Sequence, residues 1–173
     1  NVRMNTRQIS SLLQSNPITR QSFVGVFPSD LLPKTPRKVK PCSYIANTQK
    51  HDQSGEHWVC FHFPQEGPAE FFDSYGFPPQ QDFLKILGNL YRFSSSFFQF
   101  PISSACGQYC IFFILQRCSG KSMTEILNMF STTDLLENDI LVNSTVEEKF
   151  TVDLDIFDCN YIRSQFSRSF QRD

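Results

Sequence analysis

The segment Cys106–Cys118 is the feature that most restricts how this chain can fold. Its central residues, from Tyr109 to Leu115, are apolar almost without interruption, and Gly120 follows its end. A helix that is apolar on all sides cannot lie at a water-exposed surface, so other elements must cover it. The sequence therefore predicts a buried central helix over 106–118 with the rest of the chain packed around it.

Shorter helices and strands are predicted on both sides of this segment. The spacing of Ile9, Leu12 and Leu13 predicts a helix over 6–14, and a capping-box pattern predicts another over 122–130. The other predicted segments are strands at 42–47, 58–63 and 69–73, a helix at 80–91, an extended piece at 97–100 and a weaker amphipathic pattern at 152–170.

Helices and strands that occur in separate runs, without βαβ alternation, are typical of an α+β domain. We expect a small mixed sheet packed against the central buried helix, in a single domain over 1–173. The 173 residues suffice for one substantial core. No run approaches the roughly 20 apolar residues that a membrane span needs. The expectation is a monomer without a membrane partner.

Cysteine usage and the amino-terminal residues indicate a compartment. Six cysteines are spread without the paired spacing of a disulfide scaffold or a structural zinc site. The polar residues 1–14 lack the apolar core of a signal peptide. We therefore expect a protein that is not secreted and has no metal.

The first 50 residues are basic and the rest of the chain is acidic. Residues 1–50 hold eight Lys and Arg and one acid, whereas 51–173 hold eight Lys and Arg against 16 acids. Four of the basic residues fall in the proline-rich segment 33–41, namely Lys34, Arg37, Lys38 and Lys40. This segment is either a solvated loop or a contact for nucleic acid or another acidic partner.

Cys106 lies at the start of the predicted central helix, after Ser103-Ser104-Ala105 and before Gly107. Unpaired N–H groups and the positive end of the helix dipole favour a thiolate at such a position. Small neighbours allow a substrate backbone to approach. Cys106 is therefore a candidate nucleophile, although a buried cysteine can also be a plain core residue.

A nucleophilic cysteine needs a base, and His57 is best placed for this role because it lies where a polar loop enters the strand at 58–63. Five residues further on, His62 should point to the opposite face of the sheet. Pairing of the two strands across the turn at 64–68 would set His57 opposite Ser74 and beside Asp73, a candidate orienting carboxylate. The amide of Gln99 is a candidate oxyanion donor.

These residues occur in motifs that resemble those of a known family. Gly55-Glu56-His57-Trp58 is similar to a G-x-H-W motif, the segment 72–77 (FDSYGF) to F-E-x-F-G-F, and the segment 99–107 (QFPISSACG) to Q-x-P-x-S-A-A-C-G. Their order and gaps over residues 40–115 resemble those of the adenovirus-type cysteine endopeptidase family, adenain, and its relatives in adenovirus-like mobile elements.

The resemblance implies a role for each matching position. Cys106 is implied as the nucleophile, His57 as the general base, Asp73 as the orienting acid and Gln99 as the oxyanion-hole residue, in a small, distantly papain-like fold. Gly55 and Trp58, which belong to the histidine motif, are the predicted substrate-binding residues. A plain core role for Trp58 is the alternative.

The implied activity is cleavage of viral precursor proteins next to Gly-containing motifs, in the host nucleus or cytoplasm and in the virion. The sequence itself requires no cofactor. The family uses DNA and an activating peptide as cofactors, but here only the first 50 residues are basic, and residues 87–92 hold no cysteine for tethering a peptide.

Two further functions stay open. Asp73 stands where adenain has Glu, and related SUMO-deconjugating proteases use Asp, so one alternative is an isopeptidase that removes ubiquitin or a ubiquitin-like modifier. The other is a non-catalytic virion or interaction module that retains the fold.

Overall fold

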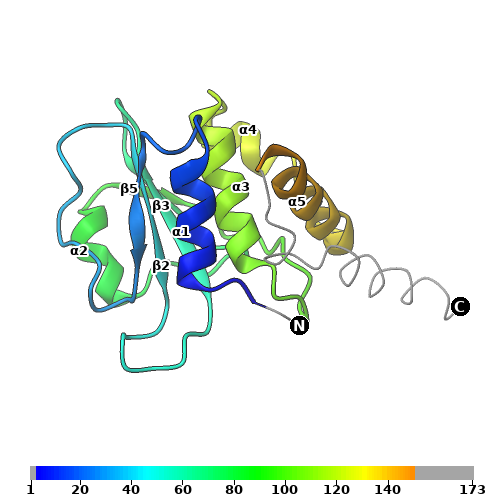
Figure 1. Ribbon diagram of the computed structural model, residues 1–173, viewed down its shortest axis with the longest axis horizontal. Coiled ribbons are helices and arrows are strands. Elements are labelled where there is room, and N and C mark those ends of the chain that lie inside the picture. The colour runs from blue at the N-terminus through cyan, green and yellow to red at the C-terminus, as the bar shows by residue number, and fades with distance from the viewer. Residues whose placement is uncertain (1–2, 151–173) are drawn as a thin grey trace, which may run out of the picture.

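The computed structural model describes residues 3–150, so the pattern predicted at 152–170 lies outside the described residues. Five strands form one open sheet in the order β1-β2-β3-β4-β5 (Figure 1). They are β1 (Phe23–Phe27), β2 (Cys42–Asn47), β3 (Trp58–Phe63), β4 (Ala69–Phe72) and β5 (Tyr91–Phe93). The sheet is mixed, because β1 runs parallel to β2 and β5 parallel to β4, while β3 is antiparallel to both of its neighbours.

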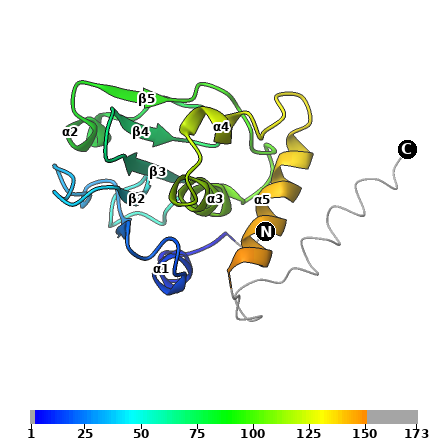
Figure 2. The ribbon, with the colours of Figure 1, turned by 90° about the horizontal axis from the view of Figure 1, so that it is seen from above.

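Helices cover both faces of this sheet. The helices are α1 (Thr6–Ser15), α2 (Leu84–Leu87), which follows the 3₁₀ turn η1 (Gln81–Phe83), α3 (Cys106–Cys118), α4 (Met123–Leu127) and α5 (Leu135–Lys149). Figures 1 and 2 show α2 on one side of the sheet and α1, α3 and α4 on the other, with α3 between the sheet and α5. The architecture is the predicted α+β class.

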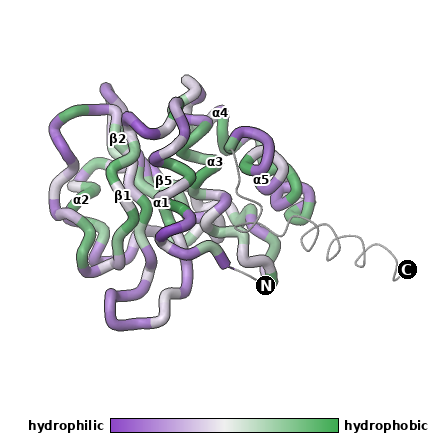
Figure 3. Tube along the Cα trace, viewed as in Figure 1, coloured by the Kyte–Doolittle hydropathy of each residue, from purple (hydrophilic) through white to green (hydrophobic). Residues whose placement is uncertain are grey.

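The central helix is as the sequence predicts. Ten consecutive residues of α3, Cys106 to Leu115, are buried. One apolar cluster joins α1, α3, α4 and α5 to the face of the sheet that α3 covers. A second cluster fills the space between the opposite face and α2. Because both faces are covered, every residue of β2 and β3 is buried. Figure 3 shows hydrophobic residues concentrated in the strands and α3, and hydrophilic residues along the loop between β2 and β3.

Three predicted details differ from the structure. The helix predicted over 80–91 ends at Leu87, where Gly88 takes a positive φ of 73°, and β5 follows it. The β3–β4 ladder pairs Cys60 with Phe72, one residue away from the predicted register. The helix predicted over 122–130 ends at Leu127.

Three elements of the structure were not predicted, namely β1, β5 and α5. The two strands lie at the edges of the sheet, and α5 packs against α3. Between residues 3 and 150, no helix is both long enough and apolar enough to cross a membrane.

Candidate active site

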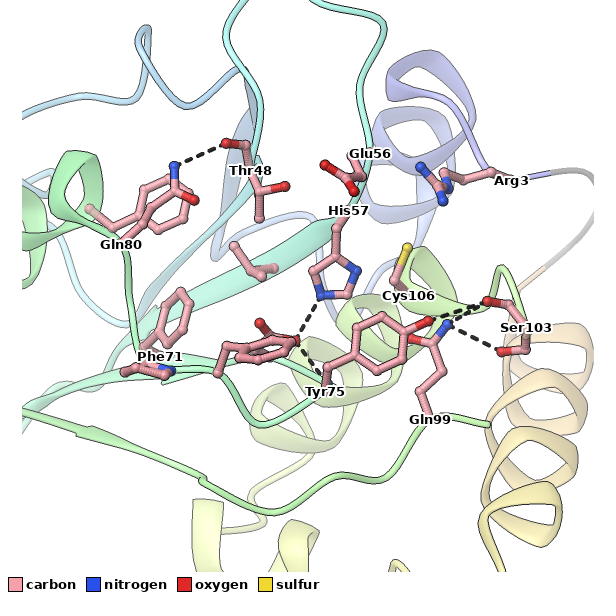
Figure 4. A pocket seen from close by; sticks show the side chains of 15 residues that line it. Arg3, Thr48, Glu56, His57, Phe71, Tyr75, Gln80, Gln99, Ser103 and Cys106 are labelled. Carbon is pink, nitrogen blue, oxygen red and sulfur yellow. Dashed lines mark hydrogen bonds and ion pairs between the residues drawn. The ribbon is translucent and has the colours of Figure 1, made fainter. Parts of the chain in front are cut away.

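The predicted residues His57, Asp73, Gln99 and Cys106 lie around one cavity of about 510 Å³ (Figure 4). His57 comes directly before β3, Asp73 directly after β4, and Cys106 is the first residue of α3. The antiparallel pairing of β3 and β4 brings the first two together, and packing of α3 against β3 adds the third.

Cys106 begins α3 without a side-chain cap, since Ala105 at the N-cap position makes no such hydrogen bond. The positive end of the helix dipole is therefore directed at the thiol. Burial raises the pKa of Cys106, but the hydrogen bond and the charge of His57 outweigh burial and lower the pKa below its ordinary value. The Trp58 backbone N–H and the charge of Arg3 act in the same direction.

His57 lies between Asp73 and Cys106. Its Nε2 donates to Asp73 Oδ1 at 2.7 Å, and Figure 4 shows the other side of the ring turned toward Cys106. Burial lowers the pKa of His57, but hydrogen bonds to Asp73 and Cys106 outweigh it and raise the pKa to about 9. The opposite shifts of the two pKa values favour a thiolate–imidazolium pair at neutral pH.

Asp73 is fixed by its own turn. Its Oδ1 also accepts the backbone N–H of Tyr75 at 2.8 Å, so the carboxylate bonds both to the local backbone and to His57. The turn requires glycine at position 76, where φ is +76° and an added Cβ would lie 2.6 Å from the Ser96 carbonyl oxygen.

Gln99 is fully buried, at 0% exposed, and its amide is oriented at both ends. Ser74 Oγ donates to Oε1 at 2.6 Å, which turns Nε2 toward Ser103. That nitrogen donates to the carbonyl oxygen of Ser103 at 2.9 Å and lies 3.1 Å from its Oγ. Both serines thus place an N–H₂ group at the edge of the cavity that also contains Cys106.

The two residues predicted to bind substrate do not line the cavity. Trp58 is buried, and its indole N–H donates to the carbonyl oxygen of Met4 at 2.9 Å, which anchors the segment before α1. Gly55 is half-buried in the β2–β3 loop, and its carbonyl oxygen accepts from Arg3 at 3.5 Å. Arg3 itself lines the cavity.

Of the other two histidines, neither faces the cavity. His62 bonds to Ser43 Oγ at 2.7 Å on the α3 side of the sheet, as its odd offset from His57 predicts, and burial lowers its pKa to about 3. His51 is paired with Asp30 at the surface.

In the basic segment 33–41, the side chain of Arg37 forms hydrogen bonds, whereas the three lysine side chains are exposed. Arg37 donates to the carbonyl oxygens of Val39, Gln21 and Pro41, at 2.9, 2.7 and 3.2 Å, so its guanidinium holds this loop together. Lys34, Lys38 and Lys40 are exposed. Contact with nucleic acid through these lysines stays a prediction.

Sequence reasoning did not identify the residues that orient the site. Ser74, Tyr75 and Ser103 contact His57 or Gln99 directly. Their one signal was proximity in sequence, because Ser74 and Tyr75 follow Asp73 and Ser103 precedes Cys106. Among residues 3–150, no cluster of three or more His, Cys, Asp or Glu side chains could hold a metal ion.

The fold is that of a solved viral protease. Two crystal structures of the ASFV pS273R protease superpose with TM-scores of 0.54 and 0.51, at 19% sequence identity in both cases. The match covers 81% of this chain and 66% of the protease, so this chain spans slightly less than two thirds of that protein's length. No family model and no curated protein matches the sequence. The likeness is one of fold, and it agrees with the expected distantly papain-like architecture.

Proposed function

We propose that this chain is a cysteine endopeptidase of the viral type that cleaves precursor proteins next to Gly-containing motifs. The observation that carries the proposal is the arrangement of Asp73, His57 and Cys106 around one cavity, with the amide of Gln99 at its edge. A fold shared with a viral protease supports it.

The reaction begins with the thiolate of Cys106. Its sulfur attacks the scissile carbonyl carbon, and the carbonyl π electrons move to oxygen as the C–S bond forms. The oxyanion would be stabilised by N–H groups at the start of α3 and by the amide of Gln99. Asp73 holds the imidazolium in the orientation that this step needs.

Collapse of the tetrahedral intermediate breaks the C–N bond. The leaving amine takes the proton of His57, and a thioester to Cys106 remains. A water molecule then gives a proton to His57 and attacks the thioester. The second collapse releases the new carboxyl group and restores the thiolate–imidazolium pair.

The preference for glycine is supported by the burial of the nucleophile. Cys106 is only 2% exposed and is flanked by Ala105 and Gly107. A scissile carbonyl can reach such a sulfur only if the residues beside it have small side chains. Substrates of this class imply a site of action in the host nucleus or cytoplasm and in the virion.

An isopeptidase that removes a ubiquitin-like modifier is the second candidate, and the aspartate at position 73 favours it. Such modifiers end in Gly-Gly, so the same narrow approach to Cys106 would accept them. The chemistry would be unchanged, and only the leaving amine would differ.

The experiment compares two substrates at equal concentration. One is a peptide with an internal Gly-Gly motif, and the other is a ubiquitin-like modifier joined through Gly-Gly to a lysine side chain. We expect the peptide to be cut at least about tenfold faster, with cleavage lost in Cys106→Ala. Cys110→Ala, one turn further along α3, is the matched control and should retain activity.

If the modifier were released faster than the peptide is cut, the isopeptidase function would be favoured over the endopeptidase function. If the folded wild type cut neither substrate, the non-catalytic module would be favoured.

A further inference from the structure

Tyr75 contacts both His57 and Asp73, the candidate base and acid of the site. Its ring stacks on the imidazole of His57, with centroids 4.8 Å apart and planes 26° apart, and on Phe97 at 5.1 Å. Its backbone N–H donates to Asp73 Oδ1. The tyrosine ring therefore has a fixed orientation relative to both residues.

The hydroxyl of this ring lies at the same part of the cavity as the amide of Gln99, the candidate oxyanion donor. It donates to the carbonyl oxygen of Ser103 at 3.5 Å, which is long for a hydrogen bond of a hydroxyl group. The same carbonyl already accepts Gln99 Nε2 at 2.9 Å. Figure 4 shows the hydroxyl of Tyr75 beside the Gln99 amide, and both residues line the cavity with Cys106.

A hydroxyl group is suited to this position because its hydrogen rotates freely about the C–O bond. The amide of Gln99 has less freedom, since Ser74 holds its oxygen and Ser103 accepts from its nitrogen. Burial raises the pKa of Tyr75, and the nearby Cys106 thiolate raises it further, so the hydroxyl keeps its proton at neutral pH.

We infer that Tyr75 is a catalytic residue whose hydroxyl donates a hydrogen bond to the oxyanion formed when Cys106 attacks the scissile carbonyl. The inference rests on the proposed peptidase activity. In the tetrahedral intermediate, the hydroxyl hydrogen turns from the Ser103 carbonyl oxygen to the substrate oxygen. It returns when the intermediate collapses, and no proton is transferred.

The test is Tyr75→Phe, which keeps the ring and its stacking and removes one oxygen atom. For a fluorogenic peptidyl-Gly-Gly amide, we expect kcat to fall about 10- to 100-fold with KM nearly unchanged. Alkylation of Cys106 by iodoacetamide forms no oxyanion at a carbonyl, so its rate and pH profile should stay as in the wild type. Tyr91→Phe on β5, away from the cavity, is the matched control and should behave as the wild type.

Two results for Tyr75→Phe would overturn the inference. Wild-type kcat would show that the hydroxyl is not a donor. An equal loss of turnover and of alkylation would show that the residue acts on the Cys106–His57 pair instead. A wild type that is alkylated rapidly but hydrolyses neither the amide nor the matching peptidyl thioester would overturn the proposed function, and this inference with it.

Discussion

Three consecutive residues connect the parts of the site. Asp73 accepts from His57, Ser74 donates to Gln99, and Tyr75 stacks on the imidazole of His57. Ser74 also accepts, through its carbonyl oxygen, the backbone N–H groups of Phe98 and Gln99 at 2.9 and 3.1 Å. A single turn after β4 therefore sets the relative positions of the base and the proposed oxyanion donor.

The raised pKa of His57 predicts the alkaline limit of activity. His57 must be protonated to supply a proton to the leaving amine, and its pKa is about 9. The pKa of Cys106 is lowered, so its thiolate persists below the ordinary titration range of a thiol. We expect kcat/KM to form a bell-shaped curve whose alkaline limb falls near pH 9.

Asp73→Asn tests the cause of this limit. The charge and the hydrogen bond of Asp73 raise the pKa of His57, whereas burial lowers it and remains in the variant. The alkaline limb should therefore move to lower pH, together with a lower maximal rate. An alkaline limb that stays near pH 9 in the variant would contradict the role given to Asp73.

Residue chemistry and the family resemblance together predicted which residues would meet. A cysteine at a helix start, a histidine at a strand start, a following acid and a glutamine were expected to meet, and the structure places all four at one cavity. The contacts of Ser74 and Tyr75 could not be predicted, because they depend on how the 97–103 loop packs against the turn after β4. Trp58, a predicted substrate-binding residue with a core role as the alternative, does not line the cavity, and its indole N–H donates to the carbonyl oxygen of Met4.

Helix α5 holds the loop that contains Gln99. Asp139 Oδ1 accepts the hydroxyl of Tyr109 at 2.6 Å and the backbone N–H of Phe100 at 3.1 Å. Asn138 Nδ2 donates to the carbonyl oxygen of Phe98 at 3.1 Å. The peptide groups on both sides of Gln99 are thus bonded to one helix that contributes nothing else to the cavity.

Replacement of the buried carboxylate should weaken both stability and turnover. In Asp139→Asn, the amide oxygen can keep the donors of Tyr109 and Phe100, but the N–H₂ group then replaces Oδ2, which is buried without a hydrogen-bond partner, so we expect about 1–3 kcal/mol less unfolding free energy. Turnover should fall further than alkylation of Cys106, because the loop positions Gln99 and not the thiol. Urea unfolding and parallel kinetics would measure both effects.

Glu137→Gln on the same helix is the control for this experiment, because its side chain is exposed. It should leave both quantities unchanged. Wild-type turnover in a destabilised Asp139→Asn would show that α5 supports the fold without tuning the site.

The elements differ in how well their patterns could be recognised. Helix α3 is apolar throughout, so its burial was evident from sequence. Helix α5 was missed because two of its four buried positions, Asn138 and Asp139, are polar residues that serve the Gln99 loop and interrupt the apolar period. Strand β5 has three residues, and its pairing with β4 follows a break at Gly88 that local propensity does not reveal.

The whole molecule places the site where two layers meet. The cavity is lined by residues that precede β3, follow β4 and begin α3, so relative movement of sheet and helix would separate His57 from Cys106. The sheet and α3 are held together by a continuous apolar cluster that includes Ile45, Cys60 and Phe72 from the sheet. A viral protease of 19% identity has a similar fold, so this arrangement of layers is compatible with very different sequences.

The measurement that tests the central claim most directly is labelling by a peptidyl-Gly-Gly vinyl sulfone, read by intact mass. Wild type, Cys106→Ala and His57→Ala are compared after their folding has been checked by circular dichroism. We expect one adduct per wild-type chain, none in Cys106→Ala, and labelling slowed at least about tenfold at pH 7 in His57→Ala, where His57 no longer offsets the effect of burial on the pKa of Cys106. A folded wild type that takes up no label, or equal labelling in Cys106→Ala, would contradict the assignment of Cys106 as the nucleophile.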